Sequence, residues 1–268
     1  MINFSKIIAE KLANHRNDLK KSYFTKNELT ETKHFILDNV LPVDVVTELY
    51  ESFPNPETYH NLDSFREKKY TFARLEQLQS NLPSLITDAF QSTEVMNEIQ
   101  EITEIDGLEA DYSLYAGGIS RMDKGHFLNP HIDNSHDANR TRYRRLNILF
   151  YITPNLNESD GGNFELWDSE VKKPYKIESL FNRLVVMETN KTSWHSVDPV
   201  LNEVSRCCLS SYYFSPYSSC GEDYYHVTSF LGRPEQIFKR AYGRIDNIFR
   251  NTIARTLKIS RGRGLGRE

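Results

Sequence analysis

The spacing of apolar residues predicts helices near both ends of the chain. Phe4, Ile7, Ile8 and Leu12 recur at helical spacing, so roughly the first fifteen residues should form an amphipathic helix. Residues 34–42 are typical of a short strand that runs into a helix, whose buried side would carry Val45, Val46, Leu49 and Phe53. From Pro234 onward the pattern predicts a long helix with one apolar face, formed by Phe238, Ala241, Ile245, Phe249 and Ile253.

The middle of the chain has the pattern of a β protein. Short apolar or alternating runs predict strands at residues 110–122, 127–133, 146–153, 164–167, 183–187 and 206–214, with an edge strand at 224–230. Residues 55–74 are polar and aromatic without a sustained period, which predicts a loop that either covers a site or only connects two elements. We therefore expect one integrated, mainly β domain with flanking helices: a helical support region with a short strand over 1–109, a β core over 110–232, and a helix with a basic tail over 233–268.

Composition narrows the functional classes. The 268 residues are 38% hydrophobic and 26% charged, which is ordinary for a globular protein, and the net charge of −4 gives no general case for nucleic acid. Contact with nucleic acid through the basic tail, which contains Arg261, Arg263 and Arg267, is a minor alternative. No apolar run is long enough to span a membrane, and the N-terminus lacks the pattern of a signal peptide. Three cysteines, two of them adjacent, make no disulfide framework, so a cytoplasmic location is expected.

The strongest chemical signal is a histidine and a carboxylate two positions apart. His131 and Asp133 point to the same side of a strand and can reach one metal ion, with His195 as a third ligand. Two imidazoles and one carboxylate form the facial triad of non-haem Fe(II) oxygenases, which leaves positions open for a cosubstrate and O₂. The His-x-Asp motif alone is weak, because chance supplies it in many proteins.

The residues around the triad make the pattern more specific. Arg206 opens the strand-like run that follows His195, and a guanidinium there is suited to a bidentate grip on the far carboxylate of 2-oxoglutarate. Gly161 and Gly162 form a turn that leads into a strand between the two histidines. The order His-x-Asp, Gly-Gly, His, Arg indicates an oxygenase far better than any one part does.

These motifs resemble a known family. The region from about Ser113 to Phe214 is similar to the prolyl-4-hydroxylase-like branch of the Fe(II)/2-oxoglutarate-dependent dioxygenases. The stretches that carry the likeness are Gly125–Asn134, Leu146–Ile152, Gly161-Gly162, His195 and Arg206. The resemblance implies a double-stranded β-helix, a jelly-roll or cupin-like barrel with the metal at its mouth. It also implies that Tyr151 and Asn147 line the cosubstrate pocket.

Several residues are candidates for the substrate side. Arg121 stands where relatives usually have a cosubstrate-binding tyrosine, which leaves the group at that position open. Asn134 follows the metal carboxylate directly, and Arg145 belongs to a polar, basic segment that suits either a solvated loop or the recognition of an anionic substrate. Trp167 is expected to be a core residue, with a substrate platform as the alternative.

Three functional hypotheses follow. The first is a 2-oxoglutarate-dependent hydroxylase that uses Fe(II), 2-oxoglutarate and O₂; the resemblance implies a prolyl residue of a protein or peptide as substrate, and a free amino acid or small polar metabolite is the runner-up. The second is a cupin-like metalloenzyme that does not use 2-oxoglutarate. The third is a non-catalytic jelly roll that binds carbohydrate or protein, with a homodimer left open in each case.

Overall fold

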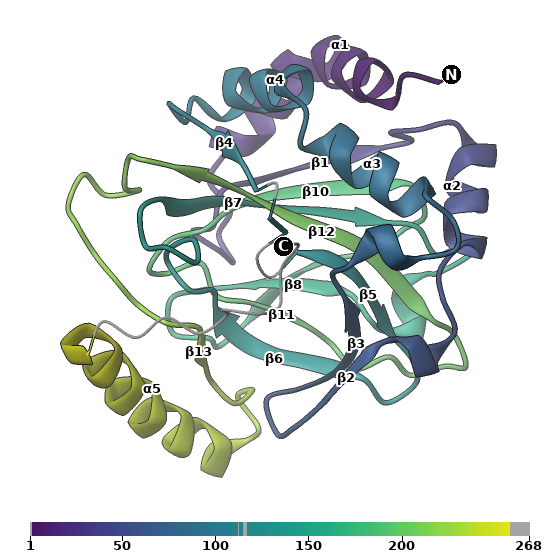
Figure 1. Cartoon of the computed structure of the whole chain (residues 1–268). Coiled ribbons are helices and arrows are strands. Elements are labelled where there is room, and N and C mark those ends of the chain that lie inside the picture. Colours follow the sequence, from purple (N-terminus) through teal and green to yellow (C-terminus); the bar gives the residue numbers. More distant parts are fainter. Residues whose placement is uncertain (1, 112, 115–116, 258–268) are drawn as a thin grey trace.

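The computed structural model describes residues 2–111, 113–114 and 117–257, and its strands belong to a single thirteen-stranded sheet (Figure 1). The strands are β1 (His34–Asp38), β2 (His60–Asp63), β3 (Glu67–Phe72), β4 (Glu109–Ala110), β5 (Gly118–Met122), β6 (Phe127–Ile132), β7 (Tyr143–Tyr151), β8 (Phe164–Trp167), β9 (Pro174–Ile177), β10 (Arg183–Glu188), β11 (His195–Val197), β12 (Arg206–Ser215) and β13 (Ser229–Phe230). The helices are α1 (Phe4–Phe24), α2 (Val43–Glu51), α3 (Leu82–Phe90), α4 (Thr93–Thr103) and α5 (Ile237–Leu257), with short 3₁₀ turns at Pro56–Thr58, Leu75–Gln77 and Glu158–Asp160. In the part of the chain just defined, no helix combines the length and the apolar character that a membrane crossing needs.

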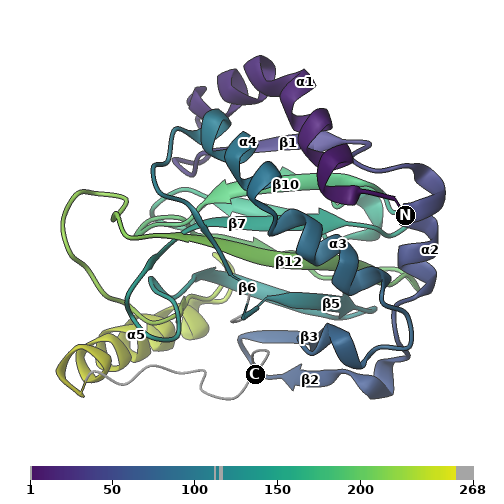
Figure 2. The same cartoon turned by 45° about the horizontal axis from the view of Figure 1, so that its top comes forward.

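The sheet curls into the predicted double-stranded β-helix. Its strand order is β1-β10-β7-β12-β5-β3-β6-β11-β8-β9, and neighbouring strands pair antiparallel. Helices α1, α3 and α4 cover the part formed by β1, β10, β7, β12 and β5 (Figure 2). Because β3 pairs with both β5 and β6, the sheet turns back on itself, and residues of β7 and β8 line the same cavity. The prediction of a mainly β jelly roll with flanking helices is therefore confirmed.

Two apolar cores lie on opposite faces of β7. Leu146, Ile148 and Phe150 are buried in the larger core, which the helices cover, while Leu149 and Tyr151 pack in a smaller core inside the barrel. Alternate residues of a strand point to opposite faces, so one strand serves both cores. Fully burying an aliphatic or aromatic side chain stabilises a fold by about 1.5–3 kcal/mol, which makes β7 a central support of the structure.

The N-terminal elements agree with the sequence predictions. Helix α1 begins after an Asn3 cap, whose side chain accepts a hydrogen bond from the Lys6 amide, and it extends beyond the predicted segment. Its buried residues Ile8, Leu12, Leu19 and Tyr23 pack in the larger core. The predicted strand and helix at 34–53 are present as β1 and α2.

Three predictions need correction, one of a loop and two of strands. Residues 55–74 are not a loop, because β2 and β3 form a hairpin whose second strand pairs with β5 and β6. The segment is polar and lacks the apolar pattern of a strand. Backbone hydrogen bonds to the neighbouring strands hold it in the sheet. The single strand expected at 110–122 is two strands, β4 and β5, and the edge strand expected at 224–230 is only the short β13.

Helix α5, which lies near β13 (Figure 1), is present as predicted but docks through its polar side. Asn247 accepts a hydrogen bond from the Phe230 amide at 3.1 Å, Asn251 accepts one from the Val227 amide at 3.0 Å, and Asp246 pairs with Arg66 at 2.6 Å. The apolar face is exposed, with Phe238 92% accessible. An amphipathic pattern shows that a helix has two faces, and the tertiary contacts decide which of them packs.

Candidate active site

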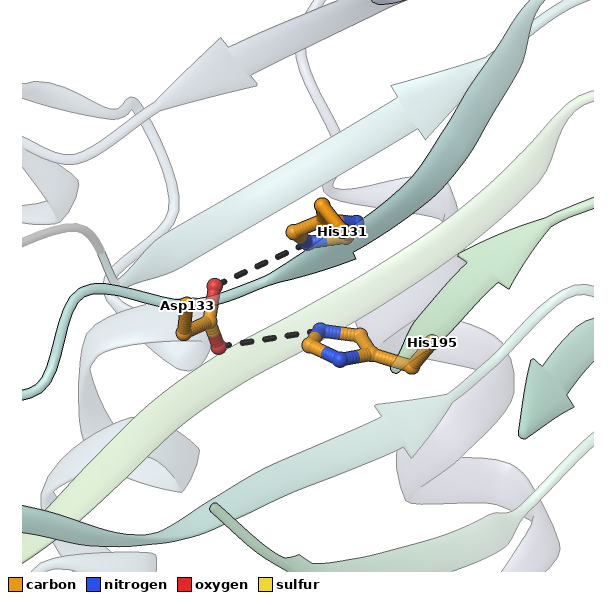
Figure 3. A group of neighbouring side chains, drawn as sticks. All are labelled: His131, Asp133 and His195. Atoms are coloured by element: carbon orange, nitrogen blue, oxygen red, sulfur yellow. Dashed lines mark ion pairs between the residues drawn. The ribbon is translucent and has the colours of Figure 1, made fainter. Parts of the chain in front are cut away.

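The side chains of the three predicted metal ligands point toward one another (Figure 3). His131 lies on β6, Asp133 follows that strand, and His195 begins β11, which pairs with β6 in a register that sets His195 opposite His131. The Nε2 atoms of both histidines are 3.6 Å from the carboxylate of Asp133, and the candidate ligand atoms all lie within 4.8 Å of one another. All three side chains are buried. This is the donor set and the crowding that a single metal ion needs.

The backbone prepares both histidines to bind a cation. Nδ1 of His131 is 3.0 Å from the Asn129 carbonyl, and Nδ1 of His195 is 2.9 Å from the Ser193 carbonyl. A carbonyl accepts hydrogen bonds, so each Nδ1 carries the proton and each Nε2 presents a lone pair toward Asp133.

Protonation states of the triad also suit a metal. Burial and the neighbouring His195 lower the pKa of His131 to about 3, so its ring is neutral near pH 7. Burial alone would raise the pKa of Asp133, but electrostatic interactions with His195 and Arg144 outweigh it and lower that pKa to about 2. A neutral imidazole beside an ionised carboxylate is ready to bind a metal without first losing a proton.

Arg206 supplies a buried positive charge in the same cavity. It is 4% exposed and lines the cavity together with His131 and His195. Within the described part of the chain its Nε donates to the Gly162 carbonyl at 2.8 Å and to the Ser179 hydroxyl at 3.2 Å, and no carboxylate pairs with it. Burying an uncompensated guanidinium is costly, so the site is built for an anionic ligand that is not part of the chain. The distal carboxylate of 2-oxoglutarate fits this requirement.

The Gly-Gly turn lets the backbone approach Arg206. Gly162 has a φ of +71°, and a Cβ there would lie 3.2 Å from Cδ of Arg206. Gly161 has a φ of +72°, and its Cβ would lie 2.0 Å from the Pro199 carbonyl oxygen, which no side chain could tolerate. The turn singled out in the sequence therefore sets the position of the guanidinium.

Tyr151 adds an unpartnered hydroxyl beside this charge, and Asn147 adds an unpartnered oxygen farther along the same strand. The Arg206 guanidinium lies over the Tyr151 ring, 4.8 Å from its centroid, and Asn147 lines the cavity. The Tyr151 hydroxyl and the Asn147 Oδ1 are buried and lack a hydrogen-bond partner among the described residues. Burial raises the pKa of Tyr151, so its hydroxyl keeps its proton and can donate it in a hydrogen bond. A buried hydroxyl without a partner next to a buried cation fits a bound dicarboxylate, whereas the Asn147 Oδ1 can only accept a hydrogen bond.

The substrate-side candidates divide into one residue that faces the cavity and three that do not. Asn134 lines the cavity, and its Nδ2 donates to the His136 carbonyl at 2.5 Å. Arg121 points to the opposite face of β5, where its Nε pairs with Asp123 at 2.8 Å. Trp167 is 2% exposed and donates from Nε1 to the Ser196 hydroxyl, so the core interpretation is the correct one.

The sequence predicts that Arg145 lies on the substrate side, but a β-bulge turns its side chain away from the cavity. The register between β7 and β12 shifts where Tyr213 faces Leu146 and Phe214 faces Arg144, which leaves Arg145 as the extra residue. Arg145 donates to the Tyr217 carbonyl and pairs with Glu188 at 3.5 Å, away from the cavity. Its neighbour Arg144 takes the cavity position. No feature of the sequence marks this bulge. The sequence pattern therefore singled out Arg145 as the candidate and missed Arg144.

The cavity that joins these residues has a volume of about 860 Å³. It extends from the β2–β3 hairpin, with His60 and Arg66, past the triad to Arg250 of α5. Small-molecule sites usually enclose about 300–1,000 Å³, so there is space for a substrate beyond a cosubstrate.

Comparison with protein families agrees with this geometry. Residues 117–214 match the model of the 2OG-Fe(II) oxygenase superfamily, a span that contains the triad and Arg206. A curated relative, the prolyl 3-hydroxylase OGFOD1 of Mus musculus, is 32% identical over 79 residues, which cover 27% of this chain and 14% of the mouse protein. The chain thus matches only a small part of that relative's length.

Solved structures confirm the fold. A prolyl-4-hydroxylase from Pseudomonas putida superposes with a TM-score of 0.55 at 16% identity, covering 75% of this chain and 97% of that protein. The non-haem α-ketoglutarate-dependent carbocyclase SnoK of nogalamycin biosynthesis superposes with a TM-score of 0.57 at 11% identity, covering 84% of this chain and 90% of SnoK. At these identities the likeness establishes the double-stranded β-helix and leaves the substrate open.

Proposed function

Residues 117–214 belong to the 2OG-Fe(II) oxygenase superfamily, and from this premise we propose that the protein hydroxylates a prolyl residue of a protein or peptide. The protein is a dioxygenase that uses Fe(II), 2-oxoglutarate and O₂. The family match favours the first functional hypothesis over the cupin-like enzyme without 2-oxoglutarate and the non-catalytic jelly roll. The prolyl substrate is supported by the 32% identity to a prolyl 3-hydroxylase over 79 residues.

The described residues have separate tasks in this reaction. His131, Asp133 and His195 would hold the iron. Arg206 would bind the distal carboxylate of 2-oxoglutarate, with the Tyr151 hydroxyl as a second donor. The Gly162 carbonyl and the Ser179 hydroxyl keep Arg206 in place, so its charge does not have to reorganise when the cosubstrate enters.

The buried walls of the cavity control where oxidation occurs. Iron, 2-oxoglutarate and O₂ supply the oxidising chemistry, in which a substrate C–H becomes C–OH while 2-oxoglutarate leaves as succinate and CO₂. Leu149, Phe164 and Val197 form apolar walls beside the triad and exclude water from it. A dry, shaped cavity directs the oxidant to the bound substrate and away from side chains.

The decisive experiment is an anaerobic titration of the Fe(II)-loaded protein with 2-oxoglutarate. We expect a weak visible charge-transfer band from the iron chelate in the wild type and no band in His195→Ala. Iron binding without a band would overturn the assignment of Arg206 as the cosubstrate anchor and favour the cupin-like alternative.

The substrate class needs its own test. Prolyl peptides and free amino acids are compared for their ability to accelerate succinate formation, with mass spectrometry to detect the added oxygen. Hydroxylation of peptides is the expected result. Acceleration only by a free amino acid or small polar metabolite would contradict the prolyl proposal while leaving the enzyme class intact.

We also propose a reducing, cytoplasmic setting. The three cysteines are free, and Cys220 is exposed. A reducing compartment would keep both the thiols and a ferrous ion in their reduced forms. Fractionation of cells that express the native protein is the direct test, and recovery from an oxidising compartment would contradict this location.

A further inference from the structure

The cavity is positively charged, although the whole protein carries a net charge of −4. Apart from Arg206 and the metal carboxylate Asp133, its charged wall residues comprise five cations and a single anion, Glu67: the cations are Arg66, Lys69, Arg74, Arg144 and Arg250. Three of these cations have partial neutralisation nearby, because Lys69 pairs with Glu67 at 3.1 Å, and Arg66 and Arg250 share Asp246 at 2.6 and 3.7 Å. The wall retains an excess of positive charge after these pairs are counted.

Arg144 is the deepest of these cations. Its side chain is 1% exposed, and Nη1 lies 3.4 Å from the Asp133 carboxylate. The guanidinium lies over the Tyr212 ring, 3.8 Å from the centroid, which fixes its plane. Among the described residues, its Nε and Nη2 have no hydrogen-bond partner. A buried guanidinium with two unpaired nitrogens is a costly arrangement unless a ligand completes it.

The cosubstrate does not account for this charge. A divalent iron, the Asp133 carboxylate, the two carboxylates of 2-oxoglutarate and Arg206 together sum to zero. The charge of Arg144 therefore remains beside a neutral centre when the site is loaded. A role limited to orienting Asp133 would use Nη1 alone and would leave Nε and Nη2 unexplained.

The β-bulge at Arg145 strengthens this reading. Asn147 faces the cavity. If side chains alternated regularly along β7, Arg145 would therefore face the cavity too, and Arg144 would lie among the apolar residues of the larger core. The register shift opposite Tyr213 and Phe214 instead turns Arg144 into the cavity. Bulges beside active sites commonly re-aim one side chain, and here the side chain is the one next to the metal carboxylate.

We propose that the substrate is an acidic peptide, and that Arg144 binds a carboxylate on a residue adjacent to the one that is hydroxylated. This inference rests on the proposed peptide hydroxylase function. Arg144 contacts a metal ligand directly, so an anion bound to it lies next to the reacting position. Arg74 and the partly neutralised Lys69, Arg66 and Arg250 extend the positive surface and would attract further acidic residues of the same peptide.

The test compares matched peptides on the intact enzyme. Prolyl peptides with Glu or Asp on either side of the proline, and the same peptides with Gln or Asn, are titrated into protein loaded with Fe(II) and 2-oxoglutarate under nitrogen. We expect the acidic members to bind at least about tenfold more tightly, because a hydrogen bond to a charged group is worth roughly that much. Equal binding of acidic and amide peptides would overturn the inference.

Two variants separate recognition by Arg144 from general charge. Arg144→Gln should abolish the preference for acidic peptides. Arg142→Gln, which removes the same charge from an exposed pair with Glu109, should retain it. A preference that survives in Arg144→Gln would also overturn the inference.

A third variant and a spectroscopic control keep the outcomes distinct. Lys69→Gln removes a cation of the cavity wall that pairs with Glu67 and does not contact Asp133 as Arg144 does, so it should reduce the preference by a smaller factor than Arg144→Gln. No reduction in either variant would refute the proposed charge recognition. The charge-transfer band of the 2-oxoglutarate chelate reports whether Arg144→Gln has kept its centre. If the band does not appear in the wild-type protein either, the proposed enzyme function itself is contradicted.

Discussion

The two faces of the barrel wall are built on different principles. On the face that the helices cover, β7 contributes Leu146, Ile148 and Phe150 to a core of buried apolar residues. On the cavity face the same strand contributes Arg144 and Asn147, which have buried polar atoms without partners. The covered face is held mainly by apolar packing within the chain, and the cavity face presents polar atoms that ligands can complete.

This difference teaches where stability and activity reside. Apolar packing on the covered face is lost when atoms are removed, so substitutions there should act mainly on the free energy of unfolding. The cavity face retains uncompensated charge and unpaired donors, which burden the ligand-free fold and are useful only when metal, cosubstrate and substrate bind. Substitutions on the two faces should therefore have opposite signatures.

The largest effect on activity is expected for His195→Ala. Loss of one of three ligands should abolish turnover and stoichiometric iron binding, while the thermal midpoint of the metal-free protein changes by only a few degrees, about 1 kcal/mol or less. Iron content, succinate formation and thermal unfolding of the metal-free forms are the measurements. Unfolding of the variant would show that His195 is needed for stability, as the residues of the helix-covered face are.

Phe150→Ala should have the opposite signature. Phe150 is fully buried and contacts Phe90, with ring centroids 5.3 Å apart, so its truncation should lower the free energy of unfolding by about 3–5 kcal/mol. Urea denaturation measures this loss. Asn147→Ala, on the cavity face of the same strand, is the matched control and should cost less than about 1 kcal/mol because Oδ1 is already unpartnered. Equal losses would break the distinction between the faces.

Arg206→Ala should weaken cosubstrate binding with little effect on stability. Breaking a buried charge pair costs on the order of 2–5 kcal/mol, so the 2-oxoglutarate concentration needed for half-maximal turnover should rise about thirtyfold or more. Cosubstrate titrations measure this change, and Arg206→Lys should restore part of the affinity. An unchanged dependence on 2-oxoglutarate would refute the assigned role.

The smallest effect concerns pH and His226, which lies on the segment beside the cavity. Burial lowers the pKa of His226 to about 4, from an ordinary value of 6.5. The unfolded chain takes up this proton below pH 6.5 and the folded chain resists it, so the stability contribution is complete above that pH and is lost as the pH falls toward 4. His226→Gln should flatten the decline of the thermal midpoint in this window, which corresponds to at most about 3 kcal/mol in the free energy of unfolding. Parallel pH profiles for the variant and the wild type would contradict this.

The sequence determined the chemistry of this protein. His131, Asp133, His195, the Gly-Gly turn and Arg206 could be recognised because ligand chemistry demands particular residue types in a particular order. The amphipathic helix at the N-terminus and the apolar strands around 146–153 and 183–187 could also be predicted, because burial on a helix or strand leaves a period in the sequence. These signals are local or depend on residue identity alone.

Only the tertiary structure decided which polar residues face the cavity. Residues 55–74 become a hairpin because β5 and β6 offer pairing partners, and backbone hydrogen bonds leave no pattern in the side chains. Helix α5 packs through Asp246, Asn247 and Asn251 because its neighbours present backbone groups and Arg66, which the helix sequence cannot reveal. The bulge at Arg145 places Arg144 in the cavity instead of Arg145. The register between β7 and β12 depends on both strands, so neither segment alone reveals the bulge. Residue types fix what a site can do, and the pairing of distant segments fixes which residues take part.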